Sequence, residues 1–319
     1  MIKKKKKRKL AKNVWVEFFR PDKISDIILP TNYKKTFKKF IKEKEIPNML
    51  LYSSRPGTGK TSLAKILCYE IEADYLYINV SEKGGIDTLR TRISTFASTK
   101  SLTGKPKIVI LDEFEGASNN LQEGLRASIE QFTNICRFIL TCNFVTRIIE
   151  PLKSRVQEFN MNYSDKSVRK EMEPQIKKRL KGILKFKEIE YKEDVLDKLI
   201  DINYPDMRKT IQMCQQYSQI NGIIDSNIFN MEKVDSEFYQ FILDRDYAKA
   251  RRYMIESGYN YDEMFTKLFN DYVPLLEAKF QPTAILIIAE FMTKSSFSVD
   301  KELNFAAMLL ELIGDLSDE

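Results

Sequence analysis

The sequence predicts an α/β protein: a parallel sheet with crossover helices, followed by a small helical lid and a helical C-terminal domain. Three observations lead to this prediction. Short apolar, β-branched runs alternate with helical patterns in the first half of the chain, which is typical of a parallel sheet. The strand signal fades after Phe159. The 319 residues also exceed what one ordinary hydrophobic core holds, so two or three domains are expected.

The expected strands are apolar runs that end at turns or at polar residues. The first run precedes a Gly/Pro-rich turn, and a helical pattern starts directly after that turn at Lys60. A Gly-Gly turn separates the second run from the next helical pattern. The expected strands are 49–52, 75–80, 107–111 and 137–142, and the expected helices include 60–71 and 86–98.

Four segments are expected along the chain. Residues 1–13 form a basic arm that we expect to be disordered, and residues 14–160 form the α/β domain. Residues 161–226 form the helical lid, and residues 227–319 form the helical C-terminal domain. The apolar positions that support these two assignments are Val195, Leu196, Leu199 and Ile200 in the lid, and Phe305, Leu309, Leu310 and Leu312 near the C-terminus.

The net charge of +7 is concentrated at the N-terminus. Residues 1–12 hold seven Lys and one Arg, so the rest of the chain carries a net charge of only about −1. Any nucleic-acid surface on the body of the protein must therefore be a local patch. The arm itself has two interpretations, because charges this dense repel one another: it is a solvated segment, or it binds DNA phosphates without sequence preference.

The composition excludes several classes of chemistry. There is no histidine, so a Ser-His-Asp triad, a His-ligated metal and a His general base are excluded. The four cysteines lack CxxC spacing and are expected to be buried thiols. No apolar stretch approaches the roughly 20 residues that span a bilayer, and no apolar core follows the basic N-terminus. We therefore expect a soluble, cytoplasmic protein, in the host cytoplasm if it is viral.

The segment Ser54–Thr61 (SRPGTGKT) has the pattern of a phosphate-binding loop. Glycines let backbone N–H groups curl round phosphates at the start of a helix, whose N-terminus adds partial positive charge. Lys60 would reach the β- and γ-phosphates, and Thr61 would supply a hydroxyl to Mg²⁺. Ser54 stands where the G-x-x-x-x-G-K-[ST] pattern has its first glycine. The loop predicts ATP and Mg²⁺ as cofactors.

Polar residues follow two other expected strands. The apolar run 108–111 ends in Asp112 and Glu113. Asp112 could hold the water shell of Mg²⁺, and Glu113 is the candidate base for the attacking water, a task that histidine cannot perform here. Asn143 follows the strand 137–142 and either orients that water or only caps a turn.

Four further segments match motifs that occur together in one family. Trp15–Pro21 (WVEFFRP) resembles W-V-E-K-Y-R-P, and Asn79–Arg90 (NVSEKGGIDTLR) resembles N-A-S-D-x-R-G-I-D-x-x-R. Ser154-Arg155 matches the first two residues of S-R-C, and Tyr204–Lys209 (YPDMRK) resembles G-D-M-R-K. With these segments the chain resembles the sliding-clamp-loader subunits of the AAA+ P-loop ATPases. Its length, the Pro-Asp before Arg208 and the short C-terminal domain resemble the ATPase subunit of T4-like phage clamp loaders.

The resemblance implies roles that spacing alone does not give. Arg155 would be an arginine finger that acts in trans on the γ-phosphate of a neighbouring subunit, and Arg208 would contact the γ-phosphate in its own subunit. Without the resemblance, Arg155 would be taken for a surface ion-pair residue. Residues 227–319 would form a collar through which subunits assemble. The implied nucleotide-binding residues are Arg20, Pro21, Pro56, Gly57, Thr58, Gly59, Lys60, Thr61, Ser62 and Asp112.

The expected helix 86–98 has one apolar face, formed by Ile86, Leu89, Ile93 and Phe96. In the family the corresponding helix tracks primer–template DNA, so the resemblance makes Arg90, Thr91 and Arg92 candidate DNA-binding residues. The alternative is a solvated amphipathic helix. The polar loop that follows carries Leu102, the candidate for an apolar contact with the clamp.

The leading hypothesis is an ATPase, producing ADP and phosphate, that is stimulated by clamp and primed DNA and places the clamp on primer–template DNA during replication. Expected partners are a sliding clamp, primer–template DNA, other copies of the chain and a non-ATPase loader subunit, and no membrane. One alternative is a nucleotide-binding structural subunit, against which Lys60, Glu113 and Arg155 argue. Another is a different AAA+ DNA machine, such as a helicase loader or a branch-migration motor, against which the family motifs argue.

Overall fold

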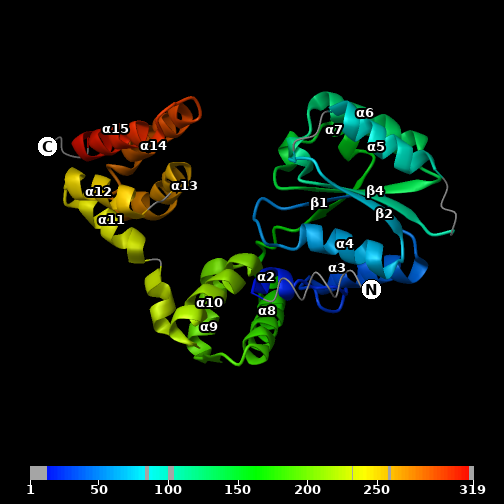
Figure 1. The fold of residues 1–319 in the computed structure, drawn as a ribbon, viewed down its shortest axis with the longest axis horizontal. Coiled ribbons are helices and arrows are strands. Elements are labelled where there is room, and N and C mark those ends of the chain that lie inside the picture. Colours follow the sequence, from blue (N-terminus) through cyan, green and yellow to red (C-terminus); the bar gives the residue numbers. More distant parts are fainter. Residues whose placement is uncertain (1–12, 83–85, 100–103, 232, 258–259, 316–319) are drawn as a thin grey trace. The chain divides into compact units, whose positions relative to one another are not determined.

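The computed structural model describes residues 13–82, 86–99, 104–231, 233–257 and 260–315. The chain forms two compact units, one ending at Asp225 and one beginning at Ser226. Figure 1 shows the elements of both units. The Lys-rich arm and Leu102 lie outside the described residues.

The N-terminal unit contains the expected parallel sheet. Its five strands lie in the order β2-β3-β4-β1-β5, and every neighbouring pair is parallel. Because β4 lies between β1 and β3, three strands that are far apart in sequence end side by side. The strands are β1 (Met49–Tyr52), β2 (Asp74–Asn79), β3 (Lys107–Asp112), β4 (Cys136–Cys142) and β5 (Gln157–Asn160).

The central strands are those that the apolar runs predicted. All residues of β3 are buried, as are all but one in each of β1 and β4, because helices cover both faces of a parallel sheet. The edge strand β5 was not predicted. Its sequence, QEFN, buries only Phe159, so it lacks the apolar run that identifies a central strand.

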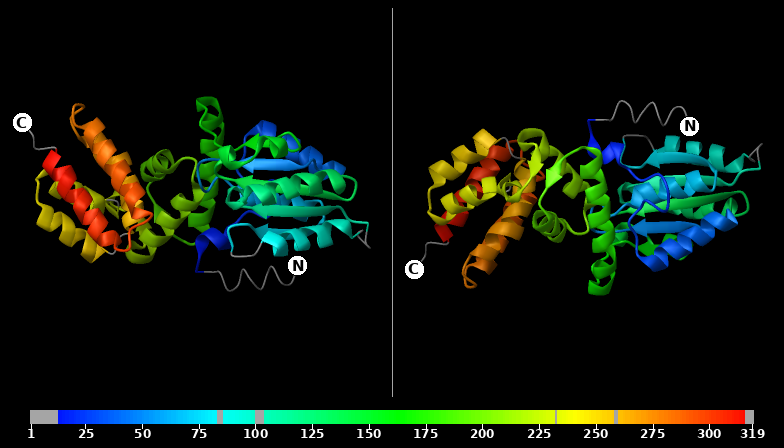
Figure 2. Two further views of the ribbon diagram at one scale, coloured as in Figure 1. Left: turned by 90° about the horizontal axis from the view of Figure 1, so that it is seen from above. Right: turned by 90° about the horizontal axis from the view of Figure 1, so that it is seen from below.

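Helices pack on the two faces of this sheet, as Figure 1 and Figure 2 show. On one face lie α5 (Ile86–Ser98), α6 (Asn119–Gln131) and α7 (Glu150–Lys153), and on the other lie α3 (Thr31–Glu43) and α4 (Lys60–Glu70). The apolar face predicted for α5 is confirmed at Leu89 and Ile93, which are buried in the core, and Phe96 packs against that core half-buried.

The C-terminal end of α5 is held by a buried lysine. Lys107, at the start of β3, is 6% exposed. Its Nζ donates to the carbonyl oxygens of Phe96 and Thr99 and to the Thr99 hydroxyl, and it lies 4.3 Å from the centre of the Phe96 ring. A cation at a helix C-terminus satisfies carbonyls that have no partner inside the helix. This contact fixes the last turn of α5.

The lid belongs to the N-terminal unit. It consists of α8 (Lys166–Phe186), α9 (Glu193–Asn203) and α10 (Met207–Asn221), and its predicted apolar positions on α9 are all buried. The short helix α2 (Trp15–Phe18) joins it, since Trp15 N donates to Gln215 Oε1. The sequence predicts a purely helical lid, but the lid also contains two short strands. β6 (Glu190–Tyr191) and β7 (Ile223–Ile224) pair in parallel. Two-residue strands are too short to produce a sequence pattern.

The C-terminal unit is helical. Its core gathers aromatic and aliphatic side chains from every long helix, and Phe305, Leu309 and Leu312 of the predicted stripe lie in it. Leu310 does not, because it is 54% exposed; it follows Leu309 directly and so faces another side of the helix. No described helix is long and apolar enough to cross a membrane. The elements are η3 (Ser226–Met231), α11 (Lys233–Leu243), α12 (Tyr247–Ser257), α13 (Tyr261–Lys267), η4 (Leu268–Tyr272), η5 (Val273–Leu275), α14 (Gln281–Ser295) and α15 (Lys301–Asp315).

Candidate active site

The phosphate-binding loop connects β1 to α4 by way of two glycines with left-handed backbone. Gly57 has φ 69° and Gly59 has φ 96°, values that side-chain-bearing residues adopt only with strain. Gly59 is the N-cap of α4, so Lys60 and Thr61 open that helix. The N-terminal N–H groups of a helix of this length favour an anion. This geometry suits a bound phosphate chain.

Ser54 takes a structural role where the motif usually has glycine. Its backbone N and its hydroxyl both donate to Asn162 Oδ1, at 2.8 and 2.9 Å. The neighbouring Ser53 hydroxyl contacts the same oxygen at 3.2 Å. One side chain at the start of the lid segment therefore anchors the entrance of the loop, which explains why a glycine is not needed at this position.

Lys60 points back along the loop. Its Nζ donates to the carbonyl oxygens of Ser53 and Arg55 at 3.1 and 3.3 Å. Burial lowers the pKa of Lys60, and the like charge of Arg208 acts in the same direction, whereas the nearby Glu115 and Asp112 carboxylates oppose it. Two carbonyl contacts are weak partners for an ammonium group, so an anionic phosphate can displace them.

Asp112 is the centre of a buried hydroxyl network. Its Oδ1 accepts from the hydroxyls of Thr61 (2.8 Å) and Thr141, and its Oδ2 accepts from the Tyr77 hydroxyl at 2.7 Å. Asp112 itself is 5% exposed. Burial raises the pKa of Tyr77, and its bond to Asp112 adds to the effect, so the phenol stays protonated and remains a donor. Hydroxyls from three elements, α4, β4 and β2, thus fix one carboxylate, and the sequence had not indicated two of these residues, Thr141 and Tyr77.

Glu113 and Asn143 stand at the ends of adjacent strands. Glu113 has φ 55°, a left-handed turn that ends β3, and its backbone N donates to Thr141 Oγ1 at 3.2 Å. Its side chain is exposed and lines the pocket. Asn143 also lines the pocket, and both its backbone N and its Nδ2 donate to Glu115 Oε1, at 2.9 and 2.7 Å. A base and an amide therefore face one cavity.

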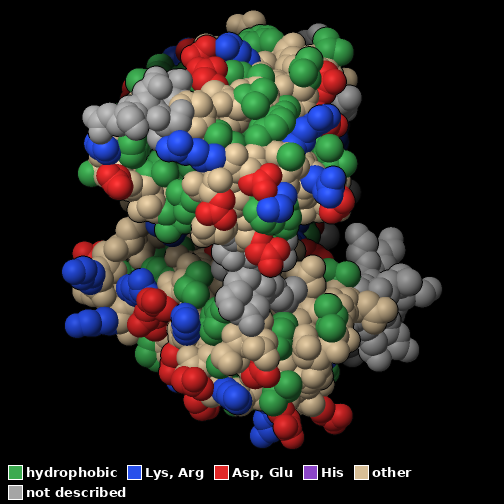
Figure 3. All heavy atoms as spheres, turned by 90° about the vertical axis from the view of Figure 1, so that its left-hand side faces the viewer, with side chains coloured by type: hydrophobic (Ala, Val, Ile, Leu, Met, Phe, Trp, Pro, Cys, Tyr) green, Lys and Arg blue, Asp and Glu red, His purple; other side chains and the backbone are tan. Residues whose placement is uncertain are grey.

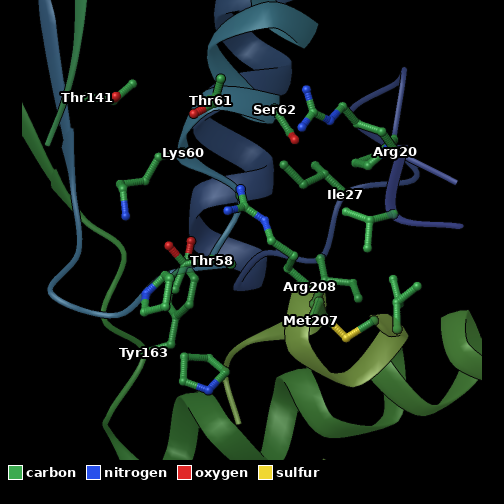
Figure 4. Close-up of a pocket in the computed structure, with 18 of the residues that line it drawn as sticks. Arg20, Ile27, Thr58, Lys60, Thr61, Ser62, Thr141, Tyr163, Met207 and Arg208 are labelled. Atoms are coloured by element: carbon green, nitrogen blue, oxygen red, sulfur yellow. The ribbon is translucent and has the colours of Figure 1, made fainter. Parts of the chain in front are cut away.

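The lid reaches into the same pocket. Arg208, on the first turn of α10, extends toward the loop near Thr58 and Lys60, as Figure 4 shows. Asp206 caps α10 by accepting from Lys209 N at 3.0 Å, and it lies so close to Gly57 that a Cβ there would be 1.8 Å from Asp206 Oδ1. Arg55 donates to the Tyr204 carbonyl at 3.2 Å. The lid turn and the phosphate loop are in direct contact.

The other end of the pocket is apolar. Ile27 and Met207 lie there, and the predicted residue Arg20 borders this end (Figure 4); Pro21 also lines the pocket. An apolar lining beside a phosphate loop suits a nucleobase. The further apolar lining residues are Val16, Phe19, Ile28, Met172, Ile176 and Ile211.

The structure brings together every predicted nucleotide-binding residue. The pocket is lined by Arg20, Pro21, Pro56, Gly57, Thr58, Gly59, Lys60, Thr61, Ser62, Asp112, Glu113, Asn143 and Arg208. Thr58 Oγ1 is buried among them without a hydrogen-bond partner in the described part of the chain, as expected for a group that awaits a ligand oxygen. This arrangement can bind a nucleoside triphosphate and place a water between Glu113 and Asn143.

Arg155 does not line this pocket. It follows α7, and its guanidinium donates to Glu130 Oε1 at 2.5 Å and to the Pro151 carbonyl at 2.7 Å. Both members of the ion pair are partly exposed. The position is compatible with a role toward another subunit, which sequence spacing alone could not indicate.

The candidate DNA-binding residues lie on α5. Arg90 and Arg92 are exposed, but the Arg90 guanidinium lies over α6, where it donates to the Asn120 carbonyl and passes beside Gly124. Arg90 thus connects the two helices that cover this face of the sheet.

A parallel sheet with the strand order described, a phosphate loop after β1, the Asp112–Glu113 pair after β3 and Asn143 after β4 define an AAA+ ATPase. The family described as "ATPase family associated with various cellular activities (AAA)" matches residues 49–163. The family described as "Sliding-clamp-loader large subunit, AAA+ ATPase lid domain" matches residues 168–230.

Among AAA+ ATPases, the chain is similar to subunits of sliding-clamp loaders. The sliding-clamp-loader large subunit of Escherichia phage RB69 is 30% identical over 306 residues, covering 94% of this chain and 95% of the relative. The corresponding subunit of Enterobacteria phage T4 is 29% identical, covering 92% and 93%. A replication factor C small subunit from Archaeoglobus fulgidus is 33% identical, covering 82% and 85%. The chain belongs to the sliding-clamp-loader family of AAA+ ATPases, which acts in DNA replication.

Solved structures show the same fold. The Thermotoga maritima RuvB Holliday junction branch migration motor has a TM-score of 0.52 and 17% identity, covering 80% of each chain. At this identity the likeness concerns the fold alone.

Proposed function

We propose that this ATPase is one subunit of a ring-like loader that opens a sliding clamp and places it on primer–template DNA. The observation that supports this most is that Lys60, Glu113 and Arg208 come from the loop, a strand end and the lid and line one pocket. Clamp-loader relatives match the chain along almost its whole length. ATP binding would couple lid position to assembly, and hydrolysis would release clamp and DNA. We propose cytoplasmic action, in the host cytoplasm if the protein is viral.

Each residue has a proposed task in hydrolysis. Lys60 neutralises the β- and γ-phosphates, Glu113 accepts a proton from the attacking water, and Asn143 orients that water. Arg208 binds the γ-phosphate from the lid, so loss of this phosphate frees the lid to move. Arg155 supplies positive charge to the γ-phosphate of a neighbouring subunit.

Thr61 and Asp112 fit a magnesium ion. Their oxygens lie 2.8 Å apart at the mouth of the phosphate loop, and the described residues contain no group of three or more His, Cys, Asp or Glu side chains that could hold a metal. Mg²⁺ is commonly bound by one or two protein oxygens plus water and phosphate oxygens. The bound ion would neutralise charge that develops on the phosphates.

Assembly with other copies is supported by two features. Arg155 lies away from the pocket of its own chain, and the C-terminal unit exposes large apolar side chains that a collar could bury. Phe297 is 86% exposed and Leu286 is 71% exposed, and hydrophobic side chains are visible on the surface of this unit in the upper half of Figure 3. We propose that copies of the chain, with a non-ATPase loader subunit, form the ring through this unit.

DNA and clamp contacts would come from α5 and the loop after it. Arg90, Thr91 and Arg92 are the proposed phosphate contacts, and Leu102 is the proposed clamp contact. The test is the ATPase rate of the purified complex alone, with its sliding clamp, with primed DNA, and with both. A clamp loader accelerates steeply only with both; stimulation by DNA alone, unaffected by clamp, would instead indicate another AAA+ DNA machine.

A further inference from the structure

Glu115 is a carboxylate that the mechanism above does not use. It lies in η1 (Phe114–Gly116), the turn directly after Glu113, and is half-buried. Its Oε1 accepts both hydrogen bonds that Asn143 donates, from the backbone N at 2.9 Å and from Nδ2 at 2.7 Å. The two residues are 28 positions apart and lie in the segments that directly follow the adjacent strands β3 and β4. Glu115 therefore bridges the two strand ends that carry the reaction.

This contact fixes which way the Asn143 amide faces. An ionised carboxylate can only accept hydrogen bonds, so the amide nitrogen must face Glu115. The amide oxygen then points elsewhere. Asn143 lines the pocket, whereas Glu115 does not lie among the described lining residues. Because Asn143 contributes to the lining and its Nδ2 is bound to Glu115, Oδ1 is the polar side-chain atom of Asn143 that is left for a ligand in the pocket.

The position of Glu115 is not explained by packing. Its Oε2 is buried and has no hydrogen-bond partner among the described residues, an arrangement that costs stability. Its charge is close enough to act on Lys60, and a negative charge behind a phosphate site repels the nucleotide. The two hydrogen bonds from Asn143 are therefore the contacts through which this carboxylate can act on the site.

We propose that Glu115 is a positioning residue for ATP hydrolysis. Its carboxylate holds the Asn143 amide with Nδ2 directed toward Glu115, so that Oδ1 is presented to the attacking water. This inference rests on the proposed role of Asn143. With Oδ1 toward the pocket, the amide accepts a hydrogen bond from the water and directs its lone pair toward the γ-phosphate. Without Glu115 the amide can rotate and present Nδ2 instead, which would hold the water in the wrong orientation.

The test compares variants that separate the acceptor from the charge. Glu115→Gln keeps an acceptor oxygen and removes the charge, whereas Glu115→Leu removes both at similar volume. In the clamp- and DNA-stimulated complex, Glu115→Leu should lower kcat by about tenfold to a hundredfold with ATP affinity retained, the size of effect expected from misplacing a reacting group. Glu115→Gln should keep kcat within about threefold and bind ATP as tightly or more tightly, because the repelling charge is gone. Glu43→Ala, at an exposed carboxylate on α3, is the control and should match the unmodified chain.

A double variant shows whether Glu115 acts through Asn143. If Glu115 acts through Asn143, Asn143→Ala with Glu115→Leu should be no slower than Asn143→Ala alone. Independent, multiplying losses would overturn the proposal, as would a normal kcat in Glu115→Leu while Asn143→Ala is slow. A normal kcat in Asn143→Ala would remove the proposed role of Asn143 and the positioning role with it.

Should Glu115→Leu not fold, Glu115→Asp decides the question. It keeps the charge but withdraws the acceptor by one methylene, so kcat should still fall several-fold. A kcat equal to that of the unmodified chain would contradict the positioning role.

Discussion

Thr141→Val tests the buried network that fixes Asp112. Thr141, on β4, donates its hydroxyl proton to Asp112 Oδ1 and accepts from Glu113 N at 3.2 Å. The side chain is 2% exposed, and valine has nearly the same shape, so no cavity forms. The substitution removes both hydrogen bonds and leaves the backbone in place.

The expected cost follows from the two bonds. Losing a hydrogen bond to an ionised acceptor costs about 1.5–3 kcal/mol, and leaving an N–H without a partner adds about 1 kcal/mol, which gives about 2.5–4 kcal/mol in total. Asp112 keeps its bonds to Thr61 and Tyr77, so the lower half of this range is favoured. Since domains unfold with about 5–15 kcal/mol, the loss is large but survivable.

Urea unfolding followed by circular dichroism measures this change. Thr141→Ser retains the hydroxyl and should recover most of the stability. Thr36→Val removes an exposed hydroxyl, bonded to the Asn32 carbonyl at 3.1 Å, and should cost less than about 0.5 kcal/mol. A Thr141→Val loss below about 1 kcal/mol, or a loss equal in Thr141→Ser, would refute the idea that the hydroxyl holds this network together.

Four further outcomes are expected. Glu113→Gln should still bind ATP but hydrolyse it about 10²-fold or more slowly, the range for losing a general base; ATP affinity lost in proportion would contradict this. Arg155→Ala subunits should regain activity when mixed with Glu113→Gln subunits, because an intact finger then faces an intact site; rates equal to the average of the parents would exclude action in trans. Arg90→Ala should lower the slope of log affinity for DNA against log salt by about one, measured by titration at several salt concentrations, with basal ATPase retained. The four cysteines are buried, and burial raises the pKa of Cys142 to about 12, so a thiol reagent at pH 8 should label none of them until denaturant is added; labelling of the folded chain would show that these thiols are accessible.

The fold was predictable where burial produces a continuous apolar run. The central strands β1, β3 and β4 are covered on both faces, so each appears in the sequence as such a run. The polar residues that end each run, or that belong to the turn after it, then lie near the C-terminal edge of the sheet. This is why Lys60, Asp112 and Asn143 could be assigned to one pocket before their positions were known.

Pairwise contacts were not predictable in the same way. The bond from Tyr77 to Asp112 joins residues 35 positions apart, and the Glu115–Asn143 contact depends on the lateral order of β3 and β4. The hydrophobic periodicity of a single sequence indicates each helix or strand separately, but it does not indicate which helices and strands lie next to each other. The edge strand β5 was missed for a related reason: one of its faces meets solvent, so its burial pattern has no continuous run.

Arg155, the proposed arginine finger, forms an ion pair with Glu130 of its own chain. The free energy of this ion pair is small compared with the transition-state stabilisation expected from an arginine finger, so the ion pair does not prevent the proposed role. Arg155 and Glu130 form an ion pair with 31% and 53% of their side chains exposed. Such pairs contribute about 0–1 kcal/mol. An arginine finger accelerates phosphoryl transfer by about 10³–10⁵-fold, which corresponds to roughly 4–7 kcal/mol of transition-state stabilisation. Releasing Arg155 from Glu130 therefore costs far less than the contact with a neighbouring γ-phosphate supplies. In the single subunit the ion pair holds the guanidinium against Glu130 on α6, and in the proposed assembly the γ-phosphate of a neighbouring subunit would replace Glu130 as its partner.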